Sequence, residues 1–117
     1  MADFTKVILS GSTNGRPIKV TQTATAGDLI HTAIAGTSDI DEIFVYACNT
    51  SAAAILLTLE WGGVSSPDDL IEYSVPAETG LYCLAPGMPL QNSLVVRAFA
   101  ASANLITIVG FVNRITT

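Results

Sequence analysis

The chain has 117 residues and a mass of 12.2 kDa, the size of a single domain spanning residues 1–117. Half of its residues are hydrophobic and only 13% are charged, against about 25% in an average soluble domain. This composition excludes an intrinsically disordered chain, which needs low hydrophobicity and high charge.

The charge balance argues against two classes of partner. The 5 basic residues are outnumbered by 10 acidic ones, giving a net charge of −5. Nucleic acids and anionic membranes are both bound through Lys and Arg, so we predict neither as a partner. The sequence also lacks the run of roughly 18 apolar residues that a transmembrane helix needs, and its start does not resemble a secretory signal peptide.

Alternation of apolar residues with a period of two recurs along the chain and predicts β-strands. The expected strands are 4–9, 18–23, 28–34, 43–49, 55–61, 70–75, 80–84, 94–100 and 105–112. The last is apolar on both faces, which indicates a central strand or one covered on both sides. Eight or nine short strands separated by Gly- and Pro-rich turns predict an all-β fold, an antiparallel β-sandwich that is jelly-roll-like.

Several segments between the strands carry turn chemistry. Asn14-Gly15 favours the two positive φ angles of a type I′ turn, so we expect a hairpin between the first two strands. Turns or loops are also expected at 51–53, 62–63, 86–89 and 91–93, and Pro67 is expected to begin a short helical turn.

No constellation of residues predicts catalysis. His31 is the only histidine, and on a regular strand Asp28 would face the opposite side, which leaves His31 with a structural or surface role. Gly-rich phosphate loops and nucleophile motifs are absent from the sequence. We therefore expect a protein that is not an enzyme, with no catalytic, metal or cofactor-binding residues and no cofactor.

Five other residues leave alternative interpretations open. Asp39 and Asp41 fit a solvated loop, although a weak cation site there stays open. Cys48 and Cys83 are interpreted as reduced, small core residues, and a bridge between them cannot be judged from sequence. Trp61 ends an alternating strand, where it is expected to cap the core, with partner contact or sugar stacking as alternatives.

Four stretches together resemble small virion proteins of tailed bacteriophages, similar to capsid decoration (cement) proteins. They are LSGSTNGRPIKV at 9–20, LTLEWGG at 57–63, PLQNSLVVRAFA at 89–100 and GFVNRI at 110–115. The resemblance covers most of the chain, and its motifs are structural rather than catalytic. It implies a β-sandwich or jelly-roll homotrimer that binds the major capsid protein lattice on the capsid exterior, made in the host cytoplasm.

The low charge agrees with that expectation, because a surface poor in charge is suited to being covered by other protein. The alternative is a tail-associated module, or a receptor- or carbohydrate-binding module, of the virion. In either case the predicted partner-interface residues lie on the projecting turn and among the basic residues: Asn14, Gly15, Arg16, Lys19, Arg97 and Arg114. For the two last arginines, pairing within the chain or with solvent is the alternative to pairing with acids of a neighbour.

Overall fold

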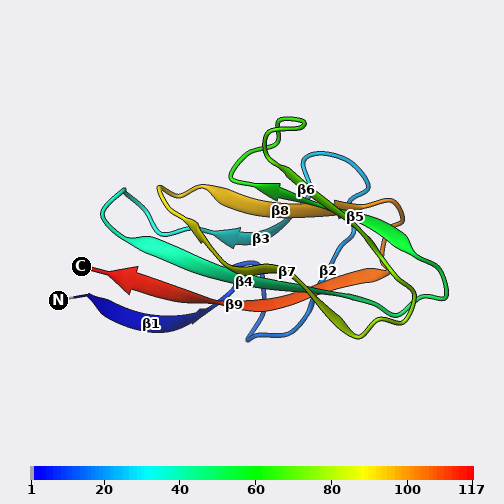
Figure 1. The fold of residues 1–117 in the computed structure, drawn as a ribbon, viewed down its shortest axis with the longest axis horizontal. Coiled ribbons are helices and arrows are strands. Elements are labelled where there is room, and N and C mark those ends of the chain that lie inside the picture. The colour runs from blue at the N-terminus through cyan, green and yellow to red at the C-terminus, as the bar shows by residue number, and fades with distance from the viewer. Residues whose placement is uncertain (1) are drawn as a thin grey trace.

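The computed structural model describes residues 2–117, which form nine β-strands in two antiparallel sheets packed face to face (Figure 1). The strands are β1 (Asp3–Ile8), β2 (Ile18–Lys19), β3 (Asp28–Thr32), β4 (Ile40–Asn49), β5 (Ile55–Trp61), β6 (Leu70–Val75), β7 (Leu81–Leu90), β8 (Val95–Ala100) and β9 (Ile106–Thr116). Residues 2–117 contain no helix, so the predicted all-β sandwich is confirmed.

The strand order is that of a jelly roll. Sheet A has the order β1-β9-β4-β7, with β2 also beside β9, and sheet B has the order β3-β8-β5-β6. The pairs are nested along the chain: β1 and β2 pair with β9, β3 with β8, β4 with β7, and β5 with β6. One long hairpin rolled into two sheets gives this pattern, and it places β9 at the centre of sheet A, as its two apolar faces predict.

The turn at Asn14-Gly15 forms, but the hairpin predicted around it does not. Both residues have positive φ angles, 55° and 88°, and the Arg16 N–H donates to the Thr13 carbonyl at 3.0 Å. However, β1 and β2 pair one after the other with β9 and not with each other. The segment between them crosses to sheet B, where the Gly11 N–H donates to the Ile30 carbonyl at 2.9 Å.

Residues 86–89, expected to form a turn, lie inside β7. Proline cannot donate a ladder hydrogen bond, but β7 is the edge strand of sheet A, where one side needs no donor. The register against β4 shifts twice, between Ile43 and Phe44 and between Val45 and Tyr46. The turns expected at 51–53 and after Pro67 are present, the latter closed by the Asp69 N–H on the Ser65 carbonyl at 2.9 Å.

The hydrophobic core lies between the two sheets, and β4 contributes only a short apolar row to it. Every second residue of β4 is buried, and Ile43, Val45 and Ala47 form the apolar middle of this inward row. The row begins with Asp41 and ends with Asn49, both fully buried. Apolar packing therefore occupies the middle of the sandwich, and a polar group closes each end of β4.

We predict that Gly110→Ala destabilises the protein by about 3 kcal/mol, because a Cβ at this position would lie 2.0 Å from the Phe44 carbonyl oxygen and force β9 from β4. The control is Gly80→Ala, whose Cβ meets no atom within 4 Å and costs about 1 kcal/mol through its positive φ of 69°. Urea unfolding of both variants measures the difference. Equal losses would contradict the close approach of β4 and β9.

Candidate functional site

The candidate site is a buried polar network that joins the two sheets at one end of the sandwich. Asp41 on β4 and Arg114 on β9 are direct cross-strand neighbours, and both point into the sandwich. His31 reaches the same point from β3 of sheet B. Asp41 and His31 are almost fully buried, whereas the Arg114 side chain is 29% exposed.

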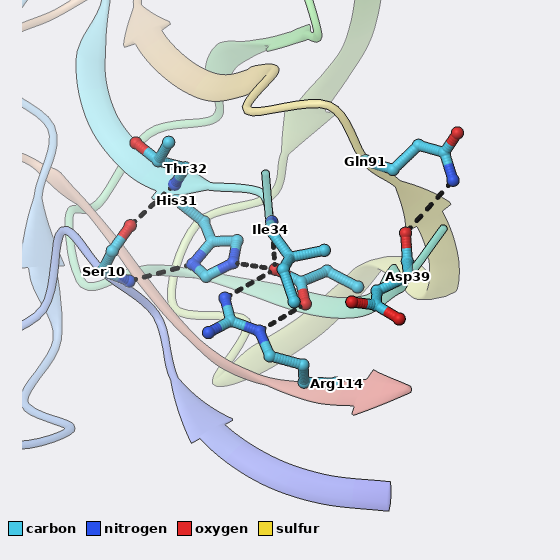
Figure 2. Close-up of polar contacts among 8 residues, drawn as sticks. Ser10, His31, Thr32, Ile34, Asp39, Gln91 and Arg114 are labelled. Carbon is cyan, nitrogen blue, oxygen red and sulfur yellow. Dashed lines mark hydrogen bonds and ion pairs between the residues drawn. The ribbon is translucent and has the colours of Figure 1, made fainter. Parts of the chain in front are cut away.

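The Asp41 carboxylate accepts four hydrogen bonds at the centre of this network. Its Oδ2 lies 2.8 Å from His31 Nε2, 3.0 Å from the Ile34 N–H nitrogen and 3.0 Å from Arg114 Nη2. Its Oδ1 accepts from Arg114 Nε at 2.8 Å, which makes the ion pair bidentate (Figure 2). Three segments of the chain are thus fixed to one charge.

The hydrogen bonds of His31 define its tautomer. The Ser10 main-chain N–H can only donate, and it lies 3.0 Å from His31 Nδ1. Nδ1 therefore accepts, and the ring proton is on Nε2, where it is donated to Asp41. The hydrogen bond from Ser10 also ties the segment after β1 to sheet B, and Figure 2 shows Ser10 at one nitrogen of the His31 ring, while the carboxylate bound by Arg114 lies at the other.

The charges of the network shift two pKa values. Burial alone raises the pKa of the Asp41 carboxyl, but the hydrogen bonds from Arg114 and His31 and the Arg114 charge outweigh it, so that the pKa is lowered. The hydrogen bond to Asp41 raises the pKa of Arg114. The carboxylate is therefore held in its charged form at neutral pH.

Ser10, His31 and Asp41 are the residue types of a hydrolytic triad, but their arrangement is structural. The Ser10 hydroxyl oxygen accepts from the Thr32 N–H at 2.7 Å, and the histidine nitrogen facing Ser10 is occupied by a main-chain donor. A general base needs a free nitrogen directed at the nucleophile's proton. In this arrangement the histidine links strands, which agrees with the structural role predicted for it.

Two expectations from the sequence are wrong at this site. Asp41 does not belong to a solvated loop, because it is the second residue of β4 and is fully buried. Asp28 and His31 lie on the same face of the sheet and not on opposite faces. A bulge between Leu29 and His31 adds one residue to β3 and so shifts the alternation of its side chains by one position. Asp28 still does not contact His31; its carboxylate accepts from Thr21 and from the Gln22 N–H.

A second polar cluster lies on the outward side of sheet B. Glu60 is fully buried there by residues 25–27, with Oε1 accepting from the Gly27 N–H at 2.7 Å and Oε2 from the Thr25 hydroxyl. Arg97, its neighbour on β8, donates to the Gly27 carbonyl at 3.4 Å. The two side chains hold residues 25–27 against this face and so cover the part of it around Glu60.

The predicted partner-interface residues lie in three places. Asn14, Gly15, Arg16 and Lys19 are exposed on the excursion between β1 and β2 and on β2 itself. Arg97 and Arg114 each have an intramolecular partner, the Gly27 carbonyl and the Asp41 carboxylate. The structure therefore does not gather these residues into one site, and their role in partner contact stays a prediction.

The cysteines and the tryptophan also have defined environments. Cys48 and Cys83 are free thiols on the outward side of sheet A, and Cys83 is exposed, so their placement in the core was wrong. Trp61 is partly buried and packs against the core, as predicted for the end of its strand.

Two adjoining apolar grooves surround Leu94, in the turn between β7 and β8. One, of about 290 Å³, is lined by Ile40, Pro89, Leu90, Gln91 and Leu94. The other, of about 170 Å³, lies between Gly62–Val64 and 93–95, with Arg97 at its wall. Leu94 is 43% exposed between them, which makes this end of the molecule apolar and hollowed.

Sequence reasoning missed the main polar residues of the molecule. The sequence places Asp41 only in an expected solvated loop with Asp39, and Glu60 is not singled out by any pattern. The signal that could have revealed the burial of Asp41 was its position in the alternation, because Asp41 and Asn49 lie in the same period-two row as Ile43, Val45 and Ala47. A charged residue within a buried row indicates a partner from elsewhere in the chain.

Comparison with known protein families, curated proteins and solved structures finds no match to this chain. Among residues 2–117 there is no cluster of three or more His, Cys, Asp or Glu residues that could hold a metal ion. Over the same residues, no helix has the length and apolar character needed to cross a membrane. What the geometry defines is a jelly-roll sandwich with a buried, internally satisfied ion network.

We predict that Asp41→Asn costs about 3 kcal/mol of unfolding free energy at pH 7, because it leaves Arg114 and the buried donors without their acceptor. The folded pKa of Asp41 lies below its unfolded value, so this stabilisation is complete above about pH 4 and decreases as the folded carboxylate is protonated at lower pH. Urea unfolding at pH 7, 5 and 3 measures the difference from the natural protein.

Asp68→Asn is the control, since Asp68 is exposed in the turn before β6 and its loss at pH 7 should stay within about 0.5 kcal/mol. A deficit for Asp41→Asn that is the same at pH 7 and pH 3 would contradict the assigned role of the carboxylate.

Proposed function

We propose that the protein is a non-enzymatic structural component of a tailed-phage particle that decorates and stabilises the capsid exterior by binding the major capsid protein lattice. The observation that carries the proposal is the apolar surface around Leu94, where two grooves meet and where Arg97 adds a positive charge. Apolar surface of this kind on a small domain is suited to burial against another protein.

The buried polar residues support the non-enzymatic part of the proposal. Among residues 2–117 no buried side-chain nitrogen or oxygen lacks a hydrogen-bond partner, so the buried polar groups serve the fold itself. Jelly rolls are common in viral capsid proteins and in lectins, which is an analogy of fold and not of site. Between a capsid protein and a lectin, the resemblance in the sequence favours a capsid protein.

The mechanism is mass action. A protein that binds the assembled lattice, and not its separate subunits, shifts the equilibrium towards the assembled state by an amount that grows with its concentration. This mechanism needs a rigid, preorganised surface and no chemical step. The Asp41 network and the Glu60 cluster favour such rigidity, because each carboxylate fixes a loop to a sheet. The resemblance implies a homotrimer, whereas the surface of sheet A leads to the twofold pair inferred below, and the molar mass in solution decides between the two.

The test mixes the purified full chain with undecorated heads of the phage that encodes it and images the particles by cryo-electron microscopy. We expect regular density at repeated positions of the lattice. Leu94→Asp should weaken this binding at least tenfold, because it places a charge where the two grooves meet.

Leu105→Asp is the matched control, since Leu105 is 39% exposed, close to the 43% of Leu94, and lies outside the grooves. It should bind heads as the natural protein does, and both variants should retain the natural circular dichroism spectrum. Labelling of tails instead of heads, or equal binding by the two variants, would overturn the proposal.

A further inference from the structure

The outward side of sheet A, called here the outer face, is a broad surface with little charge. Its residues are defined by the strand registers, since directly paired residues point to the same side. Its cross-strand rows are Phe4, Ile115 and Ile40; Lys6, Asn113, Glu42 and Pro89; Ile8, Phe111, Phe44 and Pro86; Val109, Tyr46 and Cys83; and Lys19, Thr107, Cys48 and Leu81. Its only charged side chains are Lys6, Lys19 and Glu42.

Part of the corresponding side of sheet B is covered by residues 25–27, which Glu60 and Arg97 hold in place, while Leu29 and Leu56 on that side are 39% and 42% exposed. No described segment crosses the outer face in this way: Phe4 is 72% exposed, Leu81 63% and Ile8 50%. The difference between the two sheets indicates that the outer face is covered by something other than its own chain.

We infer that two copies of this chain pair through their outer faces, about a twofold axis that runs along the strands above the boundary between β9 and β4. In a twofold contact the same surface serves both partners, so it must be complementary to itself. Attachment along the β7 edge of sheet A is disfavoured, because Pro86 and Pro89 interrupt its hydrogen-bond donors.

The residues about this axis fulfil the requirement of self-complementarity. The axis places β9 of one copy opposite β4 of the other, so Phe111 faces the second copy's Phe44 and Ile115 faces its Ile40. Within one copy the rings of Phe44 and Phe111 are already stacked, 4.5 Å apart and within 9° of parallel. Four such rings would therefore form a rigid aromatic centre at the axis.

The charges of the outer face also match those of a second copy. Lys6 extends from β1 over β9, with its Nζ 4.5 Å from the centre of the Phe111 ring. In the pair, the β4 strand of the second copy, with its Glu42, lies opposite that position. The axis repeats the contact, so two Lys6–Glu42 pairs with opposite charges flank the aromatic centre.

The area of the outer face is sufficient for a stable pair. β9, β4 and β7 have 11, 10 and 10 residues, and β1 and β2, which both pair with β9, have 6 and 2. At about 3.3 Å per residue and a strand spacing of about 4.8 Å, these strands give a flat area of roughly 620 Å². Two such faces bury about 1,240 Å² before the relief of the side chains is counted, which reaches the lower end of the range of about 1,200–2,000 Å² for specific interfaces. A second copy thus fits this face in chemistry, symmetry and size.

The test is the molar mass of the purified full chain by light scattering and sedimentation at micromolar concentrations. We expect twice the monomer mass of 12.2 kDa. Lys6→Glu and Glu42→Lys should each weaken the pair at least tenfold, because each creates like charges across the axis. The double variant Lys6→Glu/Glu42→Lys should recover the natural affinity, since the opposite charges then meet again.

Asp68→Lys is the matched control for Glu42→Lys, because it changes the charge equally in an exposed turn outside the outer face; it should remain dimeric. Phe44→Asp should give a folded monomer by circular dichroism. A monomer or trimer of the natural chain, or no recovery in the double variant, would overturn the inference. Binding of heads by the monomeric Phe44→Asp variant would leave the proposed capsid function intact.

Discussion

The buried carboxylate of Asp41 is the interaction on which the rest of the structure depends. A charge removed from water is stable only when its oxygens are fully hydrogen-bonded, and here His31, the Ile34 N–H and Arg114 satisfy them. Because these donors come from both sheets and from the loop before β4, one charge fixes how the sheets meet. Asn49 closes the other end of β4 by donating to the Val75 carbonyl at 3.0 Å.

This arrangement separates the roles of the two sides of sheet A. The inward rows of β4 and β9 are used for the core and for the Asp41 network, whereas the outward rows remain apolar and uncovered. On sheet B, in contrast, Glu60 and Arg97 hold residues 25–27 over part of the outward side. Two surfaces of this jelly roll are therefore apolar and exposed, the outward side of sheet A and the surroundings of Leu94, and they adjoin at Ile40 and Pro89.

Much of the fold followed from local patterns, whereas the candidate site did not. Period-two alternation placed most strands, and Asn14-Gly15 marked its turn, because both depend on neighbouring residues alone. The partners of Asp41 lie 10 and 73 residues away along the chain, so no local pattern connects them. The bulge beside His31 could not be predicted either, because one extra residue changes the side of the sheet to which the following side chains point and produces no recognisable sequence pattern.

The sequence by itself determined an all-β chain with a single core, a central last strand and a surface poor in charge. Only the tertiary structure decided that β1 and β2 both pair with β9, that Pro86 and Pro89 lie within an edge strand, and that Asp41 is buried. The physical reason is that alternation and turn propensity are properties of adjacent residues. Strand pairing and the burial of a charge depend instead on donors and apolar surface brought together from distant parts of the chain.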